Sequence, residues 1–182
     1  MDNKKRKRYL IIAIIIGLIL LFADLQIKKI ANQQLPLDRL RKTPVSFVDF
    51  YLTHNTGYHY IFGEIKNHKL WSLFGLTMGI ILMASISHSI LKEKTSKFII
   101  SIYTIVLTLT IGAMGNVLEI LFTGKATDYF IFHPFPWPSN LCDQYINAII
   151  YIIIPILLVH YIINWFRKKK KTQEVNQINQ NG

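Results

Sequence analysis

Two aspartates in the second half of the chain, Asp128 and Asp143, are candidates for a catalytic pair. Asp128 and Asp143 flank a short segment that lies between two long apolar runs. If both runs cross a membrane, both carboxylates lie near one face of the bilayer, and the segment can fold them toward each other. Two carboxyl groups in one site cannot easily both ionise, so one keeps its proton near neutral pH. Such a pair provides the general acid and general base that water-mediated peptide hydrolysis requires.

The simpler interpretation is that Asp128 and Asp143 are unrelated, solvated carboxylates at helix ends. Ionisable groups at membrane edges are common, so the spacing alone favours this interpretation. The elements that would position these two side chains decide between the two interpretations.

The composition indicates a membrane protein. The chain has 182 residues, 51% of them hydrophobic, and a formal net charge of +11, with the basic residues outside the apolar runs. A soluble nucleic-acid-binding protein would interleave its basic residues with the fold, so we expect no nucleic-acid partner. Cys142 is the sole cysteine and the six histidines are scattered, so the sequence supports neither a disulfide nor a metal site. We expect no cofactor.

Four apolar segments are long enough to cross a bilayer, which takes roughly 20 helical residues. The predicted spans are residues 9–30, 70–91, 98–122 and 144–166. The first follows a basic cluster, as a signal peptide does, but no small-residue cleavage site comes after it, so we expect a retained helix. We predict one four-helix domain over residues 1–171 and a disordered cytoplasmic tail over residues 172–182.

Between the first two spans lies an outer β region, at about residues 36–62. Residues 45–53 are rich in β-forming side chains and predict a strand, and residues 58–62 predict a second strand that would complete a hairpin. Asn55 follows the first strand. It is either an ordinary turn residue or an amide presented at the membrane surface.

The distribution of charged residues predicts the topology, and the topology in turn places several polar residues on the same side of the membrane. Both termini and the basic loop at residues 92–97 should be cytoplasmic, so the other two connections lie outside. Asp24 and Lys28 stand four apart on one helix face and can pair. Asn116 and Glu119 stand three apart on one face near the end of the third span, and polar groups that deep in a membrane segment normally face the bundle interior. Six polar residues from separate segments are then expected at the outer face: Asp24, Asn55, Asn116, Asp128, Asn140 and Asp143.

Five short motifs, taken in chain order, resemble those of the bacterial lipoprotein signal peptidases (signal peptidase II). The matching motifs are Asp24-x-x-x-Lys28, Asn55-Thr56-Gly57, Gly112-Ala113-Met114-Gly115-Asn116, Thr127-Asp128-Tyr129, and Trp137-Pro138 followed by Asn140-Leu141-Cys142-Asp143. The resemblance implies a membrane aspartic endopeptidase that removes the signal peptide of a prolipoprotein just before its diacylglyceryl-modified cysteine. It assigns catalysis to Asp128 and Asp143, and it makes the outer β region a small extracytoplasmic cradle. The supporting residues would be Asp24, Lys28, Asn55, Gly57, Asn116, Glu119 and Asn140.

The resemblance also implies the setting of the enzyme. We expect a multi-pass monomer in the bacterial cytoplasmic membrane, with the active site at the outer face and with membrane lipids and diacylglyceryl-modified prolipoproteins as partners.

The chain departs from the family pattern beside Asn116. The family has aspartate and then arginine where Glu119 and Ile120 stand, and Gln144 replaces a small serine. Two alternatives therefore stay open. One is a catalytically silent membrane protein that binds lipidated peptides, which Glu119 and Ile120 favour. The other is a small transporter subunit, although a transporter should place its ionisable residues near the midplane.

Overall fold

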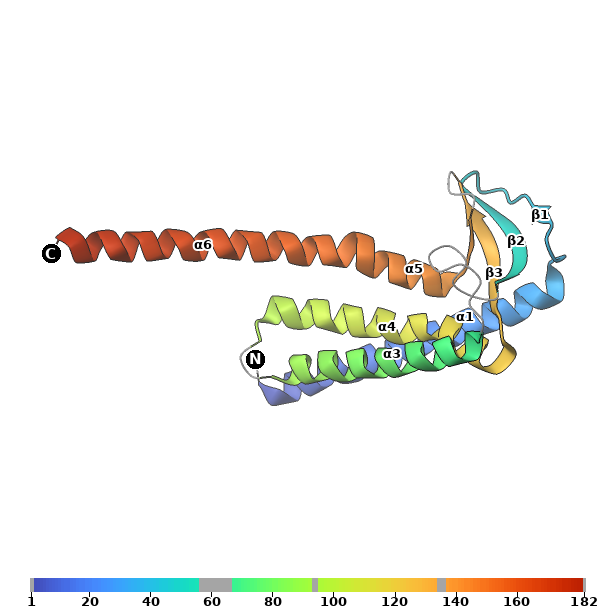
Figure 1. Ribbon diagram of the computed structural model, residues 1–182, viewed down its shortest axis with the longest axis horizontal. Helices are drawn as coiled ribbons and strands as arrows, with labels where there is room; N and C mark the ends of the chain where they lie inside the picture. Colours follow the sequence, from blue (N-terminus) through green and yellow to red (C-terminus); the bar gives the residue numbers. More distant parts are fainter. Residues whose placement is uncertain (1, 56–66, 93–94, 134–136, 182) are drawn as a thin grey trace. The chain divides into compact units, whose positions relative to one another are not determined.

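The computed structural model describes residues 2–55, 67–92, 95–133 and 137–181 (Figure 1). The chain divides into two compact units, Met1–Ile146 and Asn147–Gly182. All residues predicted for the site, from Asp24 to Asp143, belong to the first unit.

Within the described residues, four helices are long and apolar enough to cross a membrane, which confirms the predicted spans: Asn3–Gln34, His68–Leu91, Lys97–Thr123 and Leu141–Lys170. The first three are α1 (Asn3–Gln34), α3 (His68–Leu91) and α4 (Lys97–Thr123). The fourth begins with α5 (Leu141–Ala148) and continues through a π-helical turn, η1 (Ile149–Ile153), into α6 (Ile154–Asn181). The helix therefore includes residues 172–181, for which the sequence predicts disorder.

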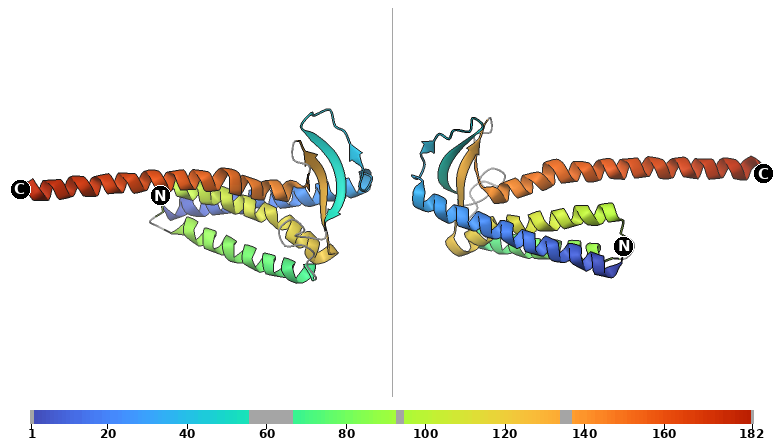
Figure 2. Two further views of the ribbon diagram at one scale, coloured as in Figure 1. Left: turned by 45° about the horizontal axis from the view of Figure 1, so that its top comes forward. Right: turned by 180° about the vertical axis from the view of Figure 1, so that it is seen from behind.

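Close packing joins α1, α3 and α4, which lie side by side in both views of Figure 2. Ala13 of α1 is fully buried against α3 and α4 residues in one apolar cluster that includes Ile90 and Leu107. Gly17 lets α1 approach α4, because a Cβ there would stand 2.7 Å from the Cβ of Ile111. Small residues that let helix backbones approach each other are typical of packing in lipid.

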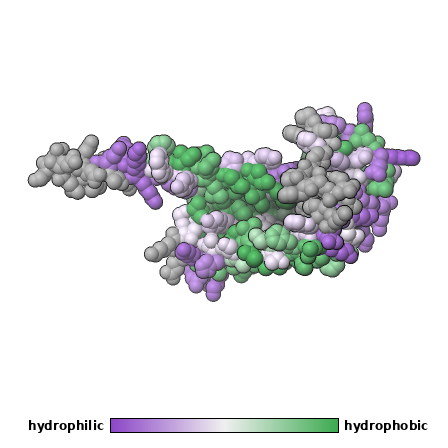
Figure 3. Space-filling view, in the orientation of Figure 1, coloured by the Kyte–Doolittle hydropathy of each residue, from purple (hydrophilic) through white to green (hydrophobic). Residues whose placement is uncertain are grey.

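Large apolar side chains cover much of the outer helix surface, as Figure 3 shows for one face. Ile19, Phe22 and Leu82 are each about half exposed or more. A soluble monomer rarely exposes contiguous apolar surface of this extent, whereas a bilayer covers it. The chain is a multi-pass membrane protein.

A four-stranded antiparallel sheet stands at one end of this helix group (Figure 1). Its strands are, in spatial order, β1 (Leu40–Arg41), β2 (Val48–Asn55), β3 (Ala126–Phe132) and β4 (Pro138–Ser139). The strand predicted at residues 45–53 is β2. The second predicted strand, residues 58–62, lies outside the described residues. The observed partners of β2 are β1 and β3, so the sheet joins the α1–α3 connection to the α4–α5 connection.

Gly124 makes the turn from α4 into β3. Its φ of +81° is left-handed, and its N–H donates to the carbonyl of Ile120 at 2.8 Å. Glycine adopts this conformation without steric cost, which ends the helix and starts the strand that carries Asp128.

Candidate active site

Asp143 lies in the first turn of α5 and is held there by the residue that precedes the helix. The backbone N–H of Asn140 donates to Asp143 Oδ2 at 3.0 Å, and the N–H of Asp143 donates to Asn140 Oδ1 at 3.2 Å. This reciprocal arrangement is that of a capping box, with Asn at the N-cap and Asp three residues later. The spacing of Asn140 and Asp143 in the sequence therefore fixes the Asp143 carboxylate at a helix N-terminus.

Asn140 also contacts the other aspartate, so one buried side chain joins the pair. Its Nδ2 donates to Asp128 Oδ1 at 2.6 Å and to the carbonyl of Thr127 at 3.3 Å. The Asn140 side chain is fully buried. The structure thus brings together Asp128 and Asp143, which come from a strand and a helix on either side of the β3–α5 connection.

The surroundings of Asp128 favour the protonated form of its carboxyl group more than water does. Its side chain is buried, and burial together with the negative charge of Asp143 raises the pKa of the carboxyl to about 7. Hydrogen bonds from Asn140 and Asn55 and the positive charge of Lys28 act in the opposite direction. Near neutral pH this carboxyl is therefore poised between its acid and its carboxylate form.

Asn55 reaches the site from the end of β2. The sheet register pairs Asn55 with Ala126 and Thr53 with Asp128. Of the two interpretations left open for Asn55, its hydrogen bond to Asp128 favours the amide donor over the plain turn residue. Gly57, predicted beside it, lies outside the described residues.

Asn116 of α4 connects Asp143 to a buried lysine. Its Nδ2 donates to Asp143 Oδ1 at 2.9 Å, and its Oδ1 accepts a hydrogen bond from Lys28 Nζ. Asp143 therefore accepts hydrogen bonds from a side-chain amide and from a backbone N–H, both of which stabilise its charged form.

Lys28 forms two ion pairs in the interior. Its Nζ lies 2.9 Å from Asp24 Oδ2, as the four-residue spacing on α1 predicts, and 3.0 Å from Glu119 Oε2 on α4. Lys28 and Asp24 are almost completely buried. Lys28 therefore provides a positive charge beside two acidic side chains, one on its own helix and one on α4.

Glu119 holds the residue before Asp128. Its Oε2 accepts the backbone N–H of Thr127 at 3.0 Å, and its Oε1 accepts the Thr127 hydroxyl at 2.6 Å. Because Thr127 is buried and directly precedes Asp128, this bidentate contact fixes the β3 backbone against α4.

Sequence reasoning missed Asn32 and gave no separate role to Thr127. Asn32 Nδ2 donates to Thr127 Oγ1 at 3.1 Å, and its Oδ1 accepts from His54 Nε2 at 2.7 Å. Asn32 stands one helical turn after Lys28, so the periodicity of α1 was the signal that could have placed it on the site face.

Cys142 packs between helices. It is fully buried, and its thiol donates to the carbonyl of Gly112 at 3.3 Å. A Cβ on Gly115 would stand 2.6 Å from Cys142 Sγ and 2.7 Å from Asp24 Oδ2, so both side chains occupy the space that this glycine leaves. Within the described ranges, no three histidine, cysteine or acidic side chains form a group that could hold a metal ion.

Comparisons with known proteins give the family of the chain and similar folds. The profile of the family "Signal peptidase (SPase) II" matches residues 14–159, most of the chain. Two solved structures of a bacterial membrane enzyme, obtained by the in meso method at 2.3 and 1.9 Å, are similar in fold. Their TM-scores are 0.63 and 0.61, each at 18% identity, and the matches cover 84% and 80% of this chain and 90% and 91% of those chains. A comparison with curated proteins finds no matching sequence. The chain belongs to the signal peptidase II family, whose members are membrane peptidases of the aspartic type.

Proposed function

We propose that this protein is an aspartic endopeptidase that removes signal peptides from diacylglyceryl-modified prolipoproteins and cuts just before the lipidated cysteine. The observation that carries the proposal is the bridge through Asn140, which contacts Asp128 at 2.6 Å and Asp143 at 3.0 Å. A buried pair held in this way has one group suited to carry a proton and one suited to carry a charge.

The two aspartates take different roles in this mechanism. Asp143 is the ionised member, because it accepts hydrogen bonds from Asn116 and Asn140 and lies at a helix N-terminus. Asp128 is the protonated member, consistent with its pKa of about 7.

Hydrolysis then proceeds in two steps. Asp143 takes a proton from a water molecule as the water oxygen attacks the scissile carbonyl carbon, while Asp128 gives its proton to the carbonyl oxygen. As the tetrahedral intermediate collapses, Asp128 takes a proton back from a hydroxyl group and Asp143 delivers its proton to the leaving nitrogen. The C–N bond breaks, and both aspartates return to their starting states.

The membrane restricts the substrate to this site. We infer that the charged ends of the spans place both termini in the cytoplasm and the sheet outside, so that the aspartate pair lies at the outer edge of the bilayer. A lipid-anchored substrate is confined to the membrane plane, which presents its peptide bond at a fixed depth. We expect the protein to act as a monomer.

The test is cleavage of a diacylglyceryl-modified prolipoprotein by the purified full-length protein, with the cut position read by mass spectrometry. Asp128→Asn and Asp143→Asn should each lower kcat by at least about 10²-fold. Asp38→Asn is the matched control: Asp38 is exposed and has a φ of 54°, which asparagine also adopts.

Substrate binding without cleavage by the unaltered protein would support the silent lipid-peptide binder instead. Ile120→Arg, which restores the family arginine, would then show whether this one side chain accounts for the missing activity. Full activity in both aspartate variants would contradict the proposed mechanism.

A further inference from the structure

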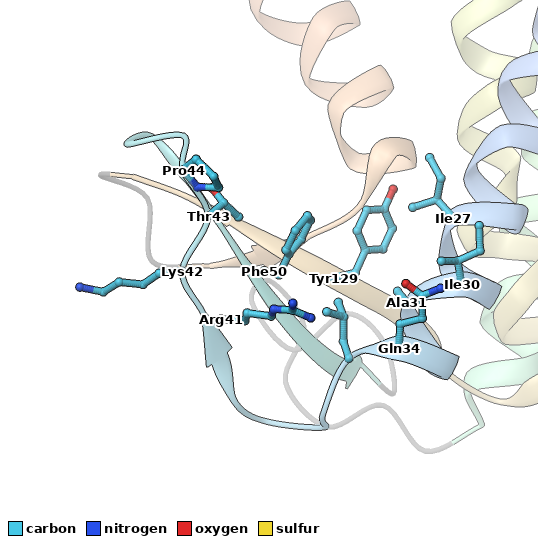
Figure 4. Close-up of a pocket in the computed structure, with 11 residues that line it drawn as sticks. Ile27, Ile30, Ala31, Gln34, Arg41, Lys42, Thr43, Pro44, Phe50 and Tyr129 are labelled. Atoms are coloured by element: carbon cyan, nitrogen blue, oxygen red, sulfur yellow. The ribbon is translucent and has the colours of Figure 1, made fainter.

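A pocket lies between the outer end of α1 and the sheet, on the side of β3 that carries Tyr129 (Figure 4). Its volume is about 470 Å³. The α1 wall is Ile27, Ile30 and Ala31, and the sheet contributes Arg41, Phe50 and Tyr129. Neighbouring strand residues point to opposite faces, so this pocket is distinct from the Asp128 site on the other face of β3.

The α1 wall of the pocket is part of the lipid-facing surface of that helix. Ile27 and Ile30 are 37% and 47% exposed, and Ile19 lies on the same helix face as Ile30, about three turns earlier. Counted from the basic cluster that ends at Arg8, about 20 residues of helix cross the hydrocarbon core. The pocket therefore opens at the level of the lipid headgroups on the opposite side of the membrane.

Arg41 points into this pocket, whose lining is mostly apolar but also includes Gln34, Lys42 and Thr43. In Figure 4 the Arg41 side chain extends toward α1, while Lys42 extends away from the pocket. Within the part of the chain that the structure describes, no carboxylate pairs with the Arg41 guanidinium. Arginine is charged at every physiological pH and matches the geometry of a phosphate group.

Further apolar side chains are exposed in and around β1 and before β2. Leu37, Leu40, Val45 and Phe47 are each more than 40% exposed. Exposed apolar residues interspersed with basic ones are typical of a surface that lies in the membrane interface.

We propose that this pocket binds an anionic phospholipid of the bilayer, with its phosphate on Arg41 and the upper part of an acyl chain along Ile27 and Ile30. The charge favours this occupant over the uncharged diacylglyceryl group of a substrate, which gives the guanidinium no counter-charge. The lipid would hold the sheet at the membrane surface. This inference stands apart from the proposed peptidase activity, and its test measures no cleavage.

The test is a lipid titration of the purified full-length protein in detergent, followed by native mass spectrometry. The probes are palmitoyl-oleoyl phosphatidylglycerol and the diacylglycerol with the same two chains. Phosphatidylglycerol should bind at least about tenfold more tightly, and Arg41→Gln should remove that difference. Arg39→Gln, which removes the same charge from an exposed position outside the pocket, should leave it unchanged.

Two results would overturn the proposal. Equal binding of diacylglycerol by the unaltered protein would assign the pocket to uncharged acyl chains, and equal weakening by Arg39→Gln would show only diffuse attraction to basic residues. If Arg41→Gln does not fold, the comparison of the two lipids on the unaltered protein still decides. Ile30→Ser should then weaken phosphatidylglycerol binding several-fold, whereas Ile19→Ser, on the same helix face but outside the pocket, should not.

Discussion

Lys28 allows several acidic side chains to share a buried site. Its ammonium group pairs with Asp24 at 2.9 Å and Glu119 at 3.0 Å, and through Asn116 it is connected to Asp143. Breaking one partner of a buried ion pair typically costs about 3–5 kcal/mol, so these contacts are coupled to folding. Asp128 is not among these partners, and burial and the Asp143 charge act on it most strongly.

The raised pKa of Asp128 predicts a pH dependence. An aspartate in an unfolded chain has a pKa of about 3.9, so the folded state retains a proton that the unfolded state releases. The stabilising contribution of this proton is complete below about pH 4 and is lost as the pH rises through about 7. If Asp128 acts as the acid, kcat should fall about tenfold per pH unit above that point.

Asn55→Ala tests the cause of this pH dependence. The Asn55 hydrogen bond favours the charged form of Asp128, so its loss should raise the pKa and move the alkaline limb of the kcat profile to higher pH. Gln33→Ala, which removes an amide side chain from an exposed position of α1, should leave the limb in place. A shift to lower pH in Asn55→Ala would contradict the assigned role of Asn55.

At the level of the elements, the β2–β3 pairing places Asn55 beside Asp128. The sequence predicted β2 from its β-forming residues, but it did not predict β3, where buried residues run without alternation from Ala126 to Phe130. The pairing joins residues more than 70 positions apart, and a local sequence pattern cannot predict such a long-range strand register. The capping relation of Asn140 and Asp143 is local, in contrast, and their spacing could have predicted it.

Helix packing behind the site predicts an effect of Gly115→Ala. The new Cβ would meet Cys142 Sγ and Asp24 Oδ2 at less than 3 Å, so it must displace the Asp24–Lys28 pair or α5. We expect a loss of about 1–3 kcal/mol in the free energy of unfolding together with lower kcat. Gly124→Ala is the contrasting variant: nothing lies within 4 Å of its Cβ, so only the left-handed backbone is strained and kcat should change less. Equal kcat in Gly115→Ala and the unaltered protein would contradict the tight packing.

For the whole molecule, the bilayer replaces much of the core that a soluble protein would need. The lengths of the apolar segments and the basic clusters predicted the four spans well, because bilayer thickness fixes the length of a span. That several site residues would gather at one end of the spans was also predictable, since Asp24, Asn116 and Asp143 each stand near a span end. The network through Lys28, Glu119 and Thr127 was not, because it depends on side-chain distances between helices.

The charge distribution predicts which residues are accessible from outside the cell. Ser46→Cys, on the exposed part of the sheet region, should react with a membrane-impermeant maleimide in intact cells. Lys7→Cys, in the basic cluster of α1, should react only after permeabilisation, and the buried Cys142 should react in neither case. Labelling of Lys7→Cys in intact cells would reverse the proposed orientation.

The proton on Asp128 is measured most directly by infrared difference spectroscopy, which follows the C=O stretch of protonated carboxylic acids during a pH titration. We predict a band that disappears as the pH rises through about 7. This band should be absent in Asp128→Asn and present in the Asp38→Asn control. A band that persists in Asp128→Asn and is lost in Asp143→Asn would show that Asp143 carries the proton, and it would contradict the assigned roles of the two aspartates.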